Sequence, residues 1–192
     1  MDRIQQLEDV ISRYSLNAHP FYQAWRMGTL PTTKLTDYSG EYGRFVATIA
    51  DGWDTIGEPA YAEEEREHEV MWADFKNELG CETISNHPQT DVLVAAAKNL
   101  FKTKPEAIGA LYAFEAQQPM TSRSKLDGLN EHYKLSDKAK VYFEVHADDI
   151  HEVEDLKTYV GNLTEEEFSR CKTACTILTA SMWSALDGVY YN

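Results

Sequence analysis

The sequence predicts an all-α helical bundle, and two observations support this fold class. Ten glycines and six prolines are few for 192 residues, and they fall at the edges of long segments with helical periodicity. Runs that alternate polar and apolar residues, as β-strands do, are not prominent. A chain of this length suits one hydrophobic core, so we expect a single domain over residues 1–192.

Helix start signals justify several elements in chain order. The first segment is amphipathic, and Pro59, Pro88 and Pro105 each suit a first helical turn, where the missing N–H costs nothing. The segment "SDKAKVYF" begins with a good cap, and Thr164 followed by Glu167 predicts a capping box. The expected helices cover residues 3–15, 19–28, 32–56, 59–80, 88–103, 105–130, 136–160 and 164–190.

The acidic balance restricts the classes of partner. Asp and Glu total 32 against 18 Lys and Arg, which gives a net charge of −14, and no basic stripe is present that neutralises phosphates. We therefore expect neither nucleic acid nor an anionic membrane as a partner. A solvated surface explains most of the acids, while a smaller set is left for metal binding or proton transfer.

The cysteines and the N-terminal segment indicate a cytoplasmic protein. Cys81, Cys171 and Cys175 are odd in number and show no disulfide framework. The first residues lack the apolar core of a signal peptide, and no run approaches the roughly 20 apolar residues of a membrane span. Cys171 and Cys175 lie one helical turn apart, and core packing is favoured for them over a metal or redox pair.

Acids and histidines recur at helical spacing on two of the predicted helices. Because each residue of a helix advances by about 100°, residues three apart share a face. Glu65 and His68 form a Glu-x-x-His unit, with Glu64 in reach of the same side. Asp148 and His151 form a matching Asp-x-x-His unit on a later helix.

Glu115 adds a carboxylate from a third predicted helix. It lies in the otherwise apolar segment "IGALYAFEAQQP", where burying an unpaired carboxylate is costly, so we expect it to have a partner. Two carboxylate-x-x-His units and lone carboxylates on separate helices are the pattern by which helical bundles hold two iron or manganese ions. Carboxylates bridge and neutralise such ions, while imidazoles complete each coordination sphere.

The position of His146 stays open on helical geometry. His146 and His151 are five residues apart, which separates them by about 140° around a regular helix and leaves His146 beside Asp149. Either Glu144, aligned with Asp148 and His151, is the third ligand of this segment, or the helix is locally unwound so that His146 turns inward.

Taken together, several segments resemble the heme-oxygenase-like dimetal oxidases, and most closely their para-aminobenzoate synthase branch. The resemblance runs through most of the chain, in "HPFYQAWRMGTL", "LTDYSGEY", "HEVMWADF", "ALYAFEAQQP", "YFEVH" and "LTASMWSALDG". It implies a heme-oxygenase-like bundle of about seven to eight helices. It also implies two bound transition-metal ions, iron with iron or iron with manganese, that activate O2 with electrons from an external reductant.

Carried over by position, the resemblance implies both metal ligands and reactive side chains. The implied ligands are Glu65 (or Glu64), His68, Glu115, His146, Asp148 and His151. Enzymes of this branch are their own substrate, because they cleave one of their tyrosines for the aromatic ring and take the amino group from a lysine. Tyr22 matches the cleaved tyrosine and Lys125 the amine donor, while Tyr38 and Tyr142 match aromatic neighbours that relay radicals or electrons.

The chain departs from the branch at three places. Between His146 and His151 it is two residues shorter than the His-x-x-x-Asp-x-x-His pattern of the family. Tyr61 stands where the branch has a glutamate ligand, and Phe114 replaces a tyrosine. A glutamate further along the first ligand helix must therefore substitute as a ligand.

Other functions stay open beside the self-consuming synthase. The same dimetal site suits an external small molecule, such as an amino acid or a fatty acid. Thiamin-salvage hydrolysis on this fold needs a cysteine nucleophile, and no cysteine lies near "ALYAFE". Heme binding through His19 has only the fold in its favour, since His19, His87 and His132 suit caps or surface positions. A non-catalytic acidic interaction protein is the last alternative, and the sequence leaves homodimer formation open.

Overall fold

Helices are the regular elements of residues 2–148 and 150–192, the part of the chain that this computed structural model describes. No strand occurs in that part, so the all-α prediction is confirmed. The α-helices are α1 (Arg3–Ser12), α2 (Pro20–Arg26), α3 (Thr32–Val46), α4 (Ile49–Ile56), α5 (Pro59–Glu78), α6 (Pro88–Leu100), α7 (Lys104–Glu115), α8 (Gln118–His132), α9 (Val141–Asp148), α10 (His151–Asn162) and α11 (Glu165–Tyr191). Two 3-10 helices, η1 (Leu16–Ala18) and η2 (Asp137–Lys140), precede α2 and α9.

Three of the predicted helices are interrupted. The ranges 32–56, 105–130 and 136–160 become α3 with α4, α7 with α8, and η2 with α9 and α10. At the first break the Thr48 hydroxyl donates to the Phe45 carbonyl at 2.7 Å, which offers the backbone an alternative to helical bonding. At the second break Pro119 lies in the first turn of α8 and starts a new helix there. Residue 149, at the third break, lies outside the described residues.

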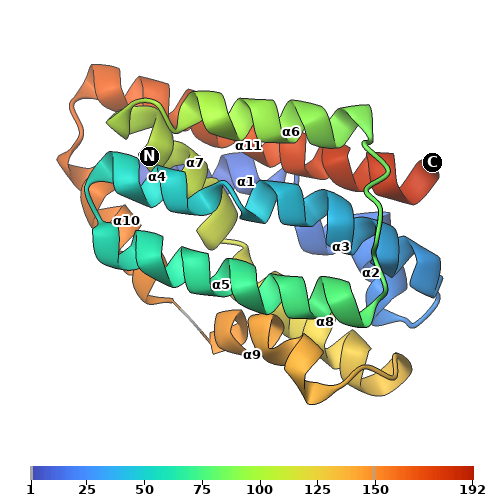
Figure 1. Cartoon of the computed structure of the whole chain (residues 1–192). Helices are drawn as coiled ribbons and strands as arrows, with labels where there is room; N and C mark the ends of the chain where they lie inside the picture. The colour runs from blue at the N-terminus through green and yellow to red at the C-terminus, as the bar shows by residue number, and fades with distance from the viewer. Residues whose placement is uncertain (1, 149) are drawn as a thin grey trace.

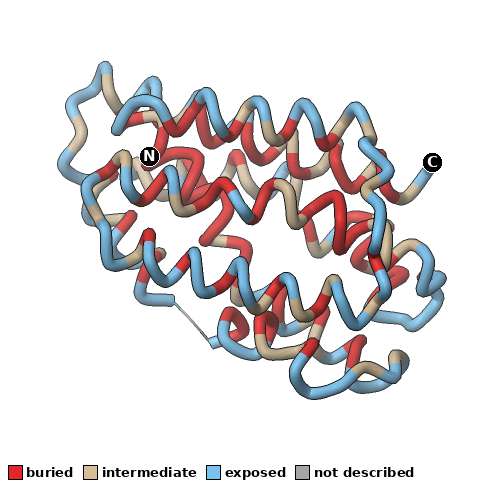
Figure 2. The backbone as a smooth tube through the Cα atoms, in the orientation of Figure 1, coloured by how far each residue is buried: buried red, intermediate tan, exposed pale blue. Residues whose placement is uncertain are grey.

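Helix α7 runs through the interior of the bundle, packed against α4, α10 and α11 (Figure 1). Every residue of α7 from Ala107 to Glu115 is buried, and the other helices turn their buried faces inward (Figure 2). Gly109 permits this packing, because a Cβ there would lie 2.0 Å from the Cys171 carbonyl oxygen of α11. Cys171 and Cys175 are free core residues, and burial raises the pKa of both thiols to about 12.

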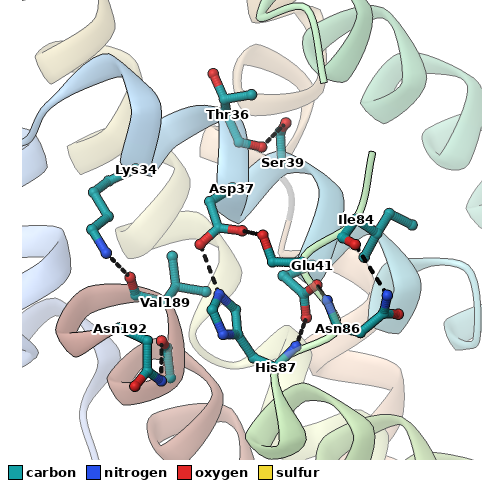
Figure 3. Close-up of polar contacts among 12 residues, drawn as sticks. Lys34, Thr36, Asp37, Ser39, Glu41, Ile84, Asn86, His87, Val189 and Asn192 are labelled. Atoms are coloured by element: carbon teal, nitrogen blue, oxygen red, sulfur yellow. Dashed lines mark hydrogen bonds and ion pairs between the residues drawn. The ribbon is translucent and has the colours of Figure 1, made fainter. Parts of the chain in front are cut away.

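The connection between α5 and α6 is fastened to α3 by a buried carboxylate (Figure 3). Glu41 accepts hydrogen bonds from the backbone N–H groups of Asn86 at 2.6 Å and His87 at 3.2 Å. The His87 imidazole Nε2 also lies 2.8 Å from an Asp37 carboxylate oxygen. These contacts satisfy backbone amides at the start of α6 and hold the connection against α3. Helix α3 in turn packs beside α5, the helix that carries the Glu-x-x-His unit.

The predicted start signals are present at both ends of the chain. Thr164 and Glu167 form the expected capping box, with Thr164 N–H donating to the Glu167 carboxylate at 2.8 Å. His19 caps α2, since its Nδ1 accepts from the Phe21 N–H at 3.1 Å. Within the described ranges, no helix combines the length and low polarity needed to cross a bilayer.

Candidate metal centre

Three carboxylates from three helices meet in the interior. Glu65 of α5 and Glu115 of α7 are each 1% exposed, and Glu152 of α10 is 4% exposed. One oxygen of each lies within 4.8 Å of the others. Buried carboxylates repel one another and lose their hydration, so such a cluster needs protons or a cation to neutralise it.

Helix α5 places its ligand candidates where a bundle helix normally keeps apolar residues. Its buried residues recur every three or four positions and so form one inward stripe: Ala62, Glu65, His68, Trp72 and Phe75. Glu65 and His68 therefore point toward the core for the same reason as their apolar neighbours. Their side chains meet, with His68 Nδ1 3.2 Å from a Glu65 carboxylate oxygen.

His146 of α9 joins this pair. Its ring centre lies 4.3 Å from that of His68, and its Nδ1 donates to the Tyr142 carbonyl at 2.6 Å. That bond leaves Nε2 as the unprotonated nitrogen of a neutral imidazole. Burial lowers the pKa of His146 to about 3, with His68 adding to the effect, so the ring is neutral at physiological pH.

Two buried polar atoms of this cluster lack a hydrogen-bond partner in the described ranges. They are Oε2 of Glu65 and Nε2 of His146. Buried polar atoms are nearly always paired, and a metal ion is a partner that suits both a carboxylate oxygen and an imidazole nitrogen. Glu65, His68 and His146, named here the inner group, therefore fit a transition-metal ion.

A second set of ligand atoms, the outer group, lies nearer the surface. It consists of Glu64, His151 and Glu152, whose ligand atoms lie within 4.8 Å of one another. His151 Nε2 is 3.7 Å from a Glu64 oxygen, and both side chains are about half exposed. The two groups are contiguous, because Glu65 of the inner group and Glu152 of the outer group belong to the same carboxylate cluster.

The structure brings most of the implied ligands together. Glu65, His68 and Glu115 lie in the buried clusters with His146, and His151 lies in the outer group. Of the two alternatives for this segment, the structure has the one in which His146 turns inward. His146 is buried whereas Glu144 is exposed, and the helix is interrupted between Asp148 and His151.

Asp148 lies apart from these groups. Its side chain is 84% exposed and forms an ion pair with Arg123 on the surface. The expectation that Asp148 and His151 share one helix face is corrected, because α9 ends at Asp148 and α10 begins at His151. A three-residue spacing aligns side chains only within an uninterrupted helix.

Glu152 is the ligand candidate that the sequence reasoning missed. It shares the inward stripe of α10 with Leu156 and Val160, at spacings of four residues. That spacing was visible in the sequence. In one unbroken helix over residues 136–160, Asp148 shares that face with Glu152 at a spacing of four, so only the break before α10 shows which of the two acids points inward.

A second buried cluster surrounds the amine of Lys125. Its Nζ lies 4.7 Å from the ring centre of Tyr22 and between 5.6 and 5.9 Å from those of Tyr38, Tyr42 and Phe143. Burial lowers the pKa of Lys125 to about 7. The Tyr22 and Tyr38 hydroxyls are hydrogen-bonded at 2.8 Å, and burial raises the pKa of both phenols well above the usual value.

Tyr142 stands beside the inner group. Its ring stacks on that of His146 with centres 4.1 Å apart, and its hydroxyl accepts a hydrogen bond from Gln118 at 2.9 Å. Trp72 connects Tyr142 to the cluster around Lys125, because its ring centre lies 4.8 Å from that of Tyr142 and 5.7 Å from that of Tyr38.

Comparison with known protein families gives a match over most of the chain. The model of a family described as iron-containing redox enzymes matches residues 52–183. A curated relative from Nitrosomonas europaea, named 4-aminobenzoate synthase, is 26% identical over 98% of this chain and 91% of its own length. A relative of the same name from Chlamydia pneumoniae is 29% identical, over 82% of this chain and 83% of its own.

Solved structures share the fold. A domain with a heme oxygenase-like fold from Shewanella denitrificans has a TM-score of 0.79 at 16% identity, covering 100% of this chain and 93% of its own. A TenA homolog from Pseudomonas syringae pv. tomato has a TM-score of 0.76 at 17% identity, covering 99% and 93%. A CADD-like protein from Nostoc punctiforme has a TM-score of 0.65 at 18% identity, covering 97% and 95%. The expected heme-oxygenase-like fold is confirmed.

Proposed function

Because the chain belongs to the family of iron-containing redox enzymes, we propose that it is an O2-dependent dimetal oxidoreductase that forms 4-aminobenzoate from its own Tyr22 and Lys125. The names of its curated relatives support the product. The contiguous inner and outer groups support two metal ions.

In this proposal each group holds one ion, iron in both or iron with manganese. Glu65, His68 and His146 hold the inner ion, and Glu152 rather than Asp148 serves the outer one. The third buried carboxylate, Glu115, lies within reach of both groups and adds charge to neutralise the ions. The bound ions supply O2 activation and electron uptake, which side chains alone do not provide.

The side chains around Lys125 supply the nitrogen and the ring. A pKa of about 7 leaves a substantial fraction of the amine uncharged at neutral pH, and only the uncharged form is nucleophilic. The amine is held over the Tyr22 ring, so the nitrogen and the aromatic carbons of the product are already adjacent. The bond to Tyr38 fixes the orientation of the Tyr22 hydroxyl.

One observation carries the proposal: the Lys125 amine lies over the Tyr22 ring, inside a chain whose curated relatives are named 4-aminobenzoate synthases. If Lys125 were a solvated surface residue, the resemblance alone would give no support for its role as amine donor. Here the lysine is 3% exposed and the tyrosine 2%, so the pair is kept from water as a reacting pair must be.

Isotope labelling tests this reading directly. Protein made with heavy-nitrogen lysine, loaded with ferrous iron and exposed to O2 and a reductant, is expected to release 4-aminobenzoate that carries the heavy nitrogen. The yield does not exceed one molecule per chain, and peptide mass spectrometry shows mass lost at Tyr22. Repeated turnover of an added amino acid or fatty acid, with Tyr22 intact, would instead establish the external-substrate oxygenase.

Metal analysis separates these enzymes from a non-catalytic interaction protein. We expect iron to bind and to be lost when Glu115 is replaced by Ala. An iron content near zero in the native chain, unchanged in Glu115→Ala, would reject both oxidoreductase readings.

A further inference from the structure

Trp72 has a fixed position one helical turn after His68 on α5. Its indole N–H donates to the Ser39 carbonyl oxygen of α3 at 2.8 Å. Gly43 of α3 leaves room for the ring, because a Cβ there would lie 2.6 Å from the indole nitrogen. The indole is therefore held against α3 in one orientation, and only 3% of the residue is exposed.

On its inner side Trp72 begins a short series of ring contacts that ends in the inner group. Its ring centre lies 4.8 Å from that of Tyr142, which stacks on His146 at 4.1 Å. The His146 ring is in turn 4.3 Å from that of His68. Aromatic rings in contact form a continuous medium for one-electron transfer, so the indole is coupled to the proposed metal ligands.

On its outer side Trp72 lines a surface groove of about 200 Å³ between α3 and α5. The groove is also lined by Gly40, Gly43, Arg44, Glu69 and Lys76. Arg44 is paired with Glu41 and Asp91, whereas Lys76 has no ion-pair partner within the described ranges. Two basic side chains, Arg44 and Lys76, line the groove against one acid, Glu69, so the groove repels a small anion less than the rest of a chain with a net charge of −14 does.

We propose that Trp72 is a port through which a small anionic one-electron donor in this groove supplies an electron to the metal centre after O2 has oxidised it. The proposal rests on the dimetal function above, and it identifies where the external reductant acts.

The electrons balance in two transfers. In the first, Tyr142 and His146 would carry one electron from the Trp72 indole to the oxidised centre, and the indole would become a radical cation. The acceptor of its N–H is a carbonyl oxygen, which is too weak a base to take the proton, so the N–H stays in place. The donor then gives one electron to Trp72, which restores the indole, and the net result is one electron moved from donor to centre.

Hexachloroiridate(III) is a suitable probe, since it is a small anionic one-electron donor whose oxidation is visible by absorbance. Protein loaded with ferrous iron is mixed with O2 and hexachloroiridate(III), and formation of hexachloroiridate(IV) is followed. Trp72→Phe is expected to slow it severalfold at unchanged iron content. Trp25→Phe is the matched control, because Trp25 is equally buried in the neighbouring aromatic cluster but neither lines the groove nor contacts Tyr142, and it is expected to leave the rate unchanged.

Radical detection gives a readout that does not depend on the donor. In samples frozen shortly after O2 addition without hexachloroiridate(III), electron paramagnetic resonance is expected to show an organic radical. Its hyperfine pattern changes when the tryptophans are ring-deuterated, and this change is absent in Trp72→Phe.

Charge-reversal variants inside and outside the groove provide the last test. Lys76→Glu is expected to slow hexachloroiridate(III) oxidation severalfold and to leave oxidation of the neutral donor tetramethylphenylenediamine unchanged. Lys102→Glu makes the same charge change outside the groove and is expected to affect neither donor. Normal iron binding with equal rates of hexachloroiridate(III) oxidation in native protein and Trp72→Phe would overturn the port alone, whereas a chain that binds no iron overturns the proposed function as well.

Discussion

The Lys125 amine and the Tyr22 ring are stacked in the interior, with Nζ 4.7 Å from the ring centre. A neutral amine tolerates this apolar position, whereas an ammonium ion loses its hydration there. The pair therefore links the proposed chemistry to the stability of the fold, and both are open to measurement.

The first prediction concerns the pH dependence of stability in the metal-free protein. Burial lowers the pKa of Lys125 to about 7 in the folded state, against an ordinary value of 10.5 in the unfolded chain. Between these values the unfolded chain binds a proton that the folded chain has released, so this group makes the free energy of unfolding rise with pH. Lys125→Met removes this titrating group. The free energy of unfolding of the native protein is therefore expected to rise, relative to that of the variant, by up to about 1.4 kcal/mol per pH unit.

Urea unfolding of both proteins at about pH 7, 8 and 9 measures this difference. Other titrating groups are common to the two proteins and cancel in the comparison. A constant difference across this range would show that Lys125 keeps an ordinary pKa in the folded chain.

The second prediction distinguishes two neighbouring acids as metal ligands. Glu152→Gln keeps the shape of a buried cluster member and removes its charge, so iron bound per chain is expected to fall by about half or more. Asp148→Asn alters an exposed carboxylate paired with Arg123 and is expected to leave the iron content unchanged. Equilibrium dialysis against ferrous iron measures both, and the opposite ranking would return Asp148 to the ligand set.

The third prediction concerns the packing that positions α7. Gly109→Ala puts a methyl group against the Cys171 carbonyl oxygen and is expected to lower the free energy of unfolding by about 1–3 kcal/mol. Gly161→Ala in α10 meets nothing within 4 Å, so it is expected to be neutral or to stabilise by up to about 1 kcal/mol. Thermal unfolding of the two variants provides the comparison, and equal effects would argue against close contact between α7 and α11.

The fourth prediction tests whether Tyr22 is consumed. Tyr22→Phe loses the hydrogen bond to Tyr38, which costs about 1 kcal/mol, and is expected to bind iron normally but to yield no 4-aminobenzoate. Tyr133→Phe also loses one hydroxyl, which donates to the Leu30 carbonyl at 2.9 Å, and is expected to keep the native yield.

Growth of a 4-aminobenzoate auxotroph expressing each tyrosine variant, with the product quantified by mass spectrometry, measures both. Full rescue by Tyr22→Phe would exclude this tyrosine as the source of the ring.

Much of the fold followed from local signals. The capping box of Thr164 and Glu167 is present, and proline marks the first turns of α5, α6 and α7 as expected. The breaks were harder to predict. The one at Thr48 depends on a hydroxyl that bonds its own backbone, which serine and threonine do at many positions without ending a helix.

The sequence by itself determined the helical content and the placement of Glu65 and His68 on one face of α5, because three-residue spacing fixes direction within an unbroken helix. Only the tertiary structure decided that Glu152 joins the carboxylate cluster while Asp148 faces solvent. The reason is that an interruption between α9 and α10 resets the helical phase. The size of that reset depends on how α10 packs against α7, a contact between residues far apart in the chain.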